Sequence, residues 1–179
     1  MKRILLSAGL AMFLLSSCED KDKGGGGESA KNKANYEKVL KAIETGDSAV
    51  LKENISMDAT DHGASMNGGD LKGDSIIWML TNAHKGFSDM KMEIVADAAE
   101  GDYVFGLVKM IGTTNSTPVW GMPPNTKVDD MSVDVIKIKD GKAVDHWAFM
   151  DQKTMMKMME HMQQPKMEDK MMMDTTKHR

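Results

Sequence analysis

The chain has 179 residues and a formal net charge of −4, from 23 basic and 27 acidic side chains. This length fits one domain with short appendages, and the acidic balance without a basic patch argues against nucleic acid as a partner. Because Cys18 is the single cysteine, an intrachain disulfide is excluded.

The start of the chain has the features of a bacterial export signal. Lys2-Arg3 is a short positive region, and residues 4–15 form an apolar run too short to span a bilayer comfortably. The run leads into Leu15-Ser-Ser-Cys18, which resembles the lipobox of bacterial lipoproteins. That resemblance implies cleavage before Cys18 and lipidation of its side chain, with residues 1–17 as the signal peptide. The alternative is an ordinary secretory signal with an incidental cysteine.

Lipid chains on Cys18 would hold the protein at a membrane surface. Glu19-Asp20 follows the cysteine and does not resemble the inner-membrane retention signal, which prefers aspartate directly after the cysteine. We therefore expect a protein of the cell envelope, anchored in the outer membrane, on either its periplasmic or its outer side. Residues 18–34 are charged and contain four consecutive glycines, a composition typical of a flexible tether.

Hydrophobic periodicity predicts helices first and strands later in the chain. The expected elements, in order, are helices over 36–44 and 49–54, a strand over 56–62, a helix over 74–85, strands over 90–98, 103–113, 131–139 and 142–150, and a helix over 152–163. Consecutive hairpins after helices indicate an α+β domain with helices packed on one face of a curved antiparallel sheet. The domain should span 35–164, and the Met/Lys-rich remainder, 165–179, is expected to be disordered.

The last two strands carry the most informative pattern. Asp140-Gly141 between them is a strong hairpin signal, because the turn needs positive φ. In the first strand, alternation places Asp134 on the same face as two isoleucines. In the second strand, His146 and Ala148 share one face and Trp147 lies on the other. This pattern predicts a cavity wall with polar points, or alternatively a half-exposed sheet with an ordinary core tryptophan.

Several motifs in fixed order resemble one known family. They are Ala42-Ile-Glu-Thr-Gly-Asp-Ser-Ala-Val-Leu, Asp61-His-Gly, Phe87-Ser-Asp-Met-Lys-Met, Glu100-Gly-Asp-Tyr-Val, Gly121-Met-Pro-Pro and the stretch from Val133 to Trp147, followed by Asp151-Gln. Together they look like the SnoaL-like polyketide cyclase (ester cyclase) family of the nuclear-transport-factor-2-like superfamily. The resemblance implies a cone-shaped α+β barrel, in which a curved sheet and about three helices surround an apolar pocket. It also implies a homodimer formed through the outer face of the sheet.

The resemblance further implies an intramolecular aldol cyclisation of a small aromatic ester, without metal or organic cofactor. Many relatives read His-Trp-Asp where this chain has His146-Trp147-Ala148, and that aspartate would transfer the proton. Alanine cannot transfer a proton, so this role could fall to Asp134, His146 or Asp151, and we assign it to Asp134 and His146. Asp134 in an apolar cone would have a raised pKa through desolvation.

Six other residues are candidates for binding the ligand, and each has a structural alternative. The candidates are Asp61, His62, Trp78, Trp120, Trp147 and Asp151. Asp61 could instead hold the glycine-rich loop that follows it, and Trp120 could anchor its own loop. Asp151 just before Gln152 fits a helix N-cap better than a reactive group. His146 itself could lie on the far face of the sheet.

Methionine is concentrated at the end of the chain, with 9 of 20 between residues 155 and 173. Thioethers are soft ligands that suit Cu(I), although methionine on an amphipathic helix more often packs against a core. Three functions therefore remain open at this stage. The domain binds a small apolar or aromatic molecule, it transfers protons as an ester cyclase-like enzyme, or its methionine-rich end handles copper.

Overall fold

The computed structural model describes residues 25–64, 68–115 and 122–163. Its elements are α1 (Gly25–Thr45), α2 (Ser48–Asn54), β1 (Ile55–His62), β2 (Leu71–Lys72), α3 (Asp74–Lys85), β3 (Lys91–Glu100), β4 (Tyr103–Thr113), β5 (Lys127–Lys139), β6 (Lys142–Met150) and α4 (Gln152–Gln163). The predicted α+β class is confirmed. Within these ranges, no helix combines the length and apolar character needed to cross a membrane.

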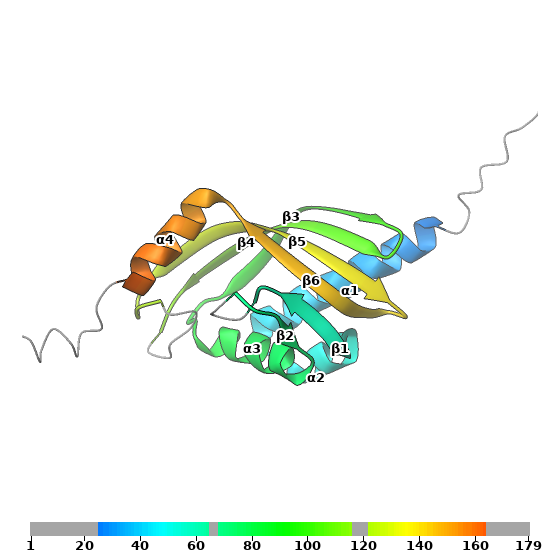
Figure 1. The fold of residues 1–179 in the computed structure, drawn as a ribbon, viewed down its shortest axis with the longest axis horizontal. Coiled ribbons are helices and arrows are strands. Elements are labelled where there is room, and N and C mark those ends of the chain that lie inside the picture. Colours follow the sequence, from blue (N-terminus) through cyan, green and yellow to red (C-terminus); the bar gives the residue numbers. More distant parts are fainter. Residues whose placement is uncertain (1–24, 65–67, 116–121, 164–179) are drawn as a thin grey trace, which may run out of the picture.

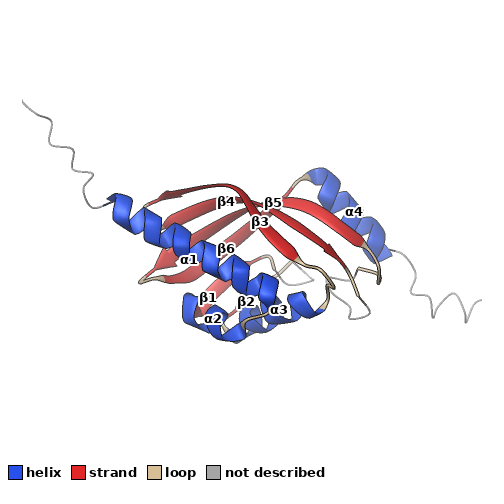
Figure 2. Cartoon of the chain, turned by 180° about the vertical axis from the view of Figure 1, so that it is seen from behind, coloured by secondary structure: helices blue, strands red, loops and turns tan. Residues whose placement is uncertain are grey.

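One curved, unclosed sheet of six strands organises the domain, in the order β2-β1-β6-β5-β4-β3. Helix α1 runs across its concave face, while α2 and α3 lie near β1 and β2 (Figures 1 and 2). The sheet was predicted to be antiparallel, but β1 pairs with β6 in parallel. These two strands are far apart in the chain, so no hairpin turn fixes their relative direction. The short strand β2 was not predicted either.

The long hairpin of β5 and β6 confirms the pattern seen in the sequence. Asp140 and Gly141 both have positive φ, at 51° and 76°, as a two-residue turn of this kind requires. Asp134, Ile136 and Ile138 all point into the core. Asp134 lies directly opposite Ala148, which places Ala148 on the same inner face.

Helix α1 begins at Gly25, so residues 25–34, which we expected to belong to the tether, are helical. Two buried amides explain this extension. Asn32 Nδ2 donates to the carbonyl of Gly101 at 3.1 Å, in the turn between β3 and β4. Asn35 Nδ2 donates to the carbonyl of Gly141 at 2.7 Å, in the turn between β5 and β6. Because α1 binds both hairpin turns, tertiary contacts outweigh the low helix propensity of the glycines.

Candidate functional site

Asp134 is a buried carboxylate on the inner face of β5, and only 8% of its surface is exposed. Helix α1 supplies its main partner, because the Tyr36 hydroxyl donates to Oδ2 at 3.0 Å. Ser132, two residues earlier on the same strand face, donates its hydroxyl to Oδ1 at 3.2 Å. These bonds offset part of the cost of removing a charge from water, and they hold the carboxylate in one orientation.

His146 lies beside this carboxylate and joins it to a second one. Its Nδ1 is 2.7 Å from Oδ1 of Asp61, which is only 5% exposed. The parallel pairing of β1 with β6 makes this contact, since Asp61 and His146 are register partners. On the other side of the ring, Nε2 is 3.9 Å from Oδ1 of Asp134, longer than a direct hydrogen bond. We call Tyr36, Asp61, Asp134 and His146 the concave cluster.

The concave cluster favours a protonated imidazole. Burial of the ring opposes its charge, but the negative charges of Asp134 and Asp61, together with the hydrogen bond to Asp61, outweigh burial and raise the pKa of His146 to about 9. For Tyr36, burial and the adjacent charge of Asp134 raise the pKa far above its usual range. At neutral pH the cluster therefore holds a cationic His146 and a protonated Tyr36 that donates to Asp134.

Gly106 on β4 makes room for the Tyr36 hydroxyl. It is the register partner of Asp134, and a Cβ at this position would overlap the Tyr36 side chain. Glycine is thus required here for close approach, because it lets the tyrosine ring lie against the sheet and reach the carboxylate.

Gly106→Ala is expected to destabilise the domain by about 2 kcal/mol, because the added methyl displaces a buried ring in a packed core. Chemical denaturation would measure this loss. In a Tyr36→Leu background the methyl meets no hydroxyl, so the cost of Gly106→Ala should shrink. An equal cost in both backgrounds would contradict the assigned contact.

Ala148 is an exposed position beside the concave cluster. It lies opposite Asp134 across the β5–β6 pair, and it is exposed. An aspartate here, as in the His-Trp-Asp pattern, would place a second carboxylate within about 5 Å of Asp134. With alanine here, the residue opposite Asp134 on β6 carries no carboxylate, and this position beside Asp134 and His146 stays exposed.

The opposite face of the same strands carries a separate group around His62. The His62 and Trp147 rings stack with centroids 4.5 Å apart and planes 10° from parallel. His62 Nε2 lies 3.1 Å from Asp145 Oδ1, and Nδ1 lies 3.5 Å from Asp70 Oδ2. Strand alternation separates these residues from their neighbours Asp61 and His146. Thus His62 and Trp147, both expected to bind the ligand, lie together but outside the concave cluster.

Three candidates remain, namely Trp78, Trp120 and Asp151. Trp78 on α3 is largely exposed, and Trp120 lies outside the described residues. Asp151 caps α4, accepting a hydrogen bond from the backbone N–H of Thr154 at 2.9 Å. That bond is the main reason the pKa of Asp151 is lowered. The structure does not bring Trp78 or Asp151 to the concave cluster, and the N-cap favoured for Asp151 by the sequence is present.

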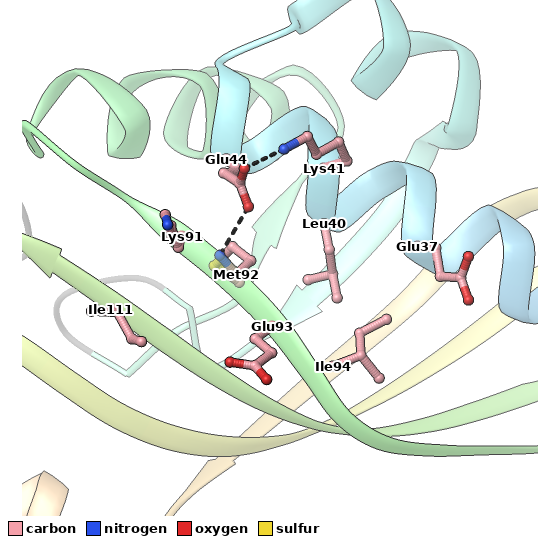
Figure 3. A pocket seen from close by; sticks show the side chains of 9 residues that line it. All are labelled: Glu37, Leu40, Lys41, Glu44, Lys91, Met92, Glu93, Ile94 and Ile111. Carbon is pink, nitrogen blue, oxygen red and sulfur yellow. Dashed lines mark hydrogen bonds and ion pairs between the residues drawn. The ribbon is translucent and has the colours of Figure 1, made fainter.

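A groove of about 480 Å³ opens between α1 and the free edge of β3. Leu40, Met92, Ile94 and Ile111 supply apolar surface, and charged side chains surround them (Figure 3). Glu44 accepts a hydrogen bond from the backbone N–H of Met92 at 3.1 Å, which joins the helix to the edge strand. The groove shares no residue with the concave cluster, so we place the candidate site by its chemistry and not by cavity volume.

Sequence reasoning assigned no role to Tyr36 or Ser132. Tyr36 fits a helical apolar pattern, so it looked like an ordinary core residue. Its position over Gly106 depends on how α1 crosses the sheet, which the local pattern does not encode. Among the described residues, no three His, Cys, Asp or Glu side chains are grouped to hold a metal ion.

Comparison with known proteins agrees with this fold. A family model for SnoaL-like polyketide cyclases matches residues 33–159. IdmH from Streptomyces antibioticus is 22% identical, with a TM-score of 0.59 over 72% of this chain and 98% of its own. A SnoaL-like protein from Jannaschia sp. CCS1 is 19% identical, with a TM-score of 0.63 over 77% of this chain and 95% of its own.

An LEH-like epoxide hydrolase from M. tuberculosis is 16% identical, with a TM-score of 0.58 over 73% of this chain and 90% of its own. These structural neighbours share the cone-type fold. None of the curated proteins compared with the chain matches it. The fold and the family match define a SnoaL-like domain of the nuclear-transport-factor-2-like type. The chain belongs to the SnoaL-like polyketide cyclase family.

Proposed function

We propose that the domain binds a small apolar or aromatic molecule on its concave face and transfers a proton on it. The observation that carries this proposal is the imidazole of His146, held between two buried carboxylates beside the exposed Ala148. A passive binding site has no need for such a group, because burying charges is costly even when they are paired. A proton-transfer site needs a donor and an acceptor close together.

The geometry supplies both partners for an enolisation. Asp134 accepts a proton from a carbon next to a carbonyl, while the Nε2–H of protonated His146 donates to the carbonyl oxygen. Their 3.9 Å separation leaves the two groups unengaged by a direct bond. Tyr36 orients the acceptor, and Asp61 orients and charges the donor. The step converts a ketone or ester into its enol, which is the nucleophile of an aldol-type cyclisation, and the reverse transfer gives isomerisation.

We further propose that the domain works in the cell envelope, attached through a lipid on Cys18. The lipobox-like Leu15-Ser-Ser-Cys18 supports this placement, with the outer membrane favoured by the residues after the cysteine. Intact-mass analysis of the protein from a bacterial host should detect a lipidated N-terminus that Cys18→Ala abolishes. An unlipidated mass for the native sequence would contradict the proposed anchor.

Hydrogen–deuterium exchange of a generic substrate tests the proton transfer. We use 2-tetralone, an aromatic ketone with acidic α-hydrogens, in D₂O with the full-length protein purified in detergent. Proton NMR should show exchange well above the rate in buffer and detergent alone. Native mass spectrometry of the same sample reports whether an organic molecule is retained. Binding without accelerated exchange would contradict catalysis and leave a binding module.

We also propose a homodimer through the outer face of β4, β5 and β6. Exposed apolar side chains lie there, including Val133 opposite Phe149 and Phe105 opposite the half-buried Val135. A contiguous apolar patch of this kind is typical of an interaction surface. A twofold axis would let each copy cover the same patch of the other.

Phe149→Glu is expected to convert the dimer to a monomer, because it buries a charge in an apolar interface. Light scattering after size exclusion measures the mass. Met57→Glu, an exposed apolar position on β1, is the matched control and should leave the dimer intact. A monomeric wild-type protein over the accessible concentration range would contradict this interface.

A further inference from the structure

Helix α4 uses methionine as its sole apolar residue type. Five of its 12 residues, Gln152–Gln163, are methionine, and none is Leu, Ile, Val or Phe. A helix face built to pack against a core or a partner normally uses branched and aromatic side chains, which have better-defined rotamers, with methionine filling gaps. The composition of α4 therefore indicates a role for the thioether sulfur of methionine, in addition to any apolar packing.

Core packing does not account for the described methionines of α4. Met155, Met156 and Met159 are 52%, 55% and 48% exposed. The helix projects from the end of the sheet that is remote from α2 (Figure 1). Leaving several large apolar side chains half in water gives up much of the free energy that burial provides. These three methionine side chains are thus accessible to solutes.

Helical spacing places four of the five methionine positions of α4 in one stripe. At 3.6 residues per turn, positions 155, 158, 159 and 162 fall within an arc of about 100° over two turns. Met155 and Met159 are i and i+4 neighbours, so they lie on one face within side-chain reach. Position 156 falls off this arc. We call positions 155, 158, 159 and 162 the α4 stripe.

We propose that Met155 and Met159, on the α4 stripe, form a binding site for a soft monovalent metal ion, Cu(I) or its redox-inert analogue Ag(I). Thioethers are neutral, soft ligands that select Cu(I) over Zn²⁺, Ca²⁺ and other harder ions. Two residues one turn apart on a preformed helix reduce the ordering cost of binding. The site is separate from the concave cluster and does not depend on its function.

Native mass spectrometry of the full-length protein in detergent, titrated with Ag(I), tests this site. We expect a silver adduct with the wild type and none with Zn²⁺ or Ca²⁺. NMR of ¹³C-methyl methionine should show the α4 signals shifting with added silver. Replacing the stripe by leucine (M155L, M158L, M159L and M162L) keeps volume and helix propensity but removes sulfur.

The stripe variant should lose silver affinity by at least about tenfold, the lower limit seen even for outer-shell changes at metal sites. The matched control, Met57→Leu with Met131→Leu, removes exposed thioethers on β1 and β5 and should bind like the wild type. Circular dichroism verifies that each variant is folded. A wild type without a silver adduct, or a folded stripe variant that retains wild-type affinity, would overturn the proposal.

Discussion

Asp134→Asn is expected to slow exchange of the α-hydrogens of 2-tetralone by about 10²–10⁴-fold, the usual contribution of a positioned acid–base group. The amide keeps the size of the side chain and an oxygen for the Tyr36 hydroxyl, so the packing should survive. The asparagine amide, however, cannot accept a proton from carbon. The rate, followed by proton NMR in D₂O, therefore reports the chemistry of one carboxylate and not the state of the fold.

Asp145→Asn is the matched control for this change. Asp145 precedes His146 on β6 but lies on the opposite face, where it contacts His62. Its amide variant should exchange 2-tetralone at the wild-type rate. If both amide variants lost activity equally, or if Asp134→Asn were fully active, Asp134 could not be the proton acceptor.

His146→Ala is expected to destabilise the domain by about 3 kcal/mol at pH 6, because it leaves Asp61 and Asp134 buried without their shared cation. This value is the lower end of the stability loss expected when one partner of a buried ion pair is removed, because the His146 side chain keeps some solvent contact. Urea denaturation, followed by far-ultraviolet circular dichroism, would measure the free energy of unfolding. His62→Ala is the control and should cost less, since its carboxylate partners are half-exposed or exposed.

The effect of His146 on stability should depend on pH in a defined direction. Its pKa is about 9 in the folded protein against an ordinary value of 6.5, so folding favours the protonated ring. This contribution is fully present below about pH 6.5 and is lost as pH rises through about 9, with a span on the order of 3 kcal/mol. The wild type should lose stability across that window while His146→Ala loses less. Parallel pH profiles would contradict the assignment.

Local sequence patterns predicted the features of the fold that depend on neighbouring residues. Alternation in β5 and β6 placed Asp134 and His146 on the inner face, and Asp140-Gly141 marked the turn. The α+β class and the family followed from the order of such segments. These features are readable because side-chain direction along a strand has a period of two.

Contacts between elements that are far apart in the chain could not be predicted from local sequence patterns. The parallel pairing of β1 with β6 brings Asp61 to His146, and no turn sequence encodes it. The role of Tyr36 depends on α1 crossing above Gly106. The extension of α1 to Gly25 depends on two hairpin turns that accept hydrogen bonds from Asn32 and Asn35. Each is a tertiary contact over many residues, where local propensity is a weak guide.

The state of the His146 ring tests the concave cluster most directly. A two-dimensional ¹H–¹⁵N NMR titration, with the signal assigned through His146→Gln, measures its pKa in the folded protein. We predict a value of about 9, as expected for an imidazolium between Asp61 and Asp134, and a fall toward the ordinary range in Asp61→Asn. A wild-type pKa at or below 6.5 would mean that burial prevails over the two carboxylates, and the cluster would then hold no cation at neutral pH.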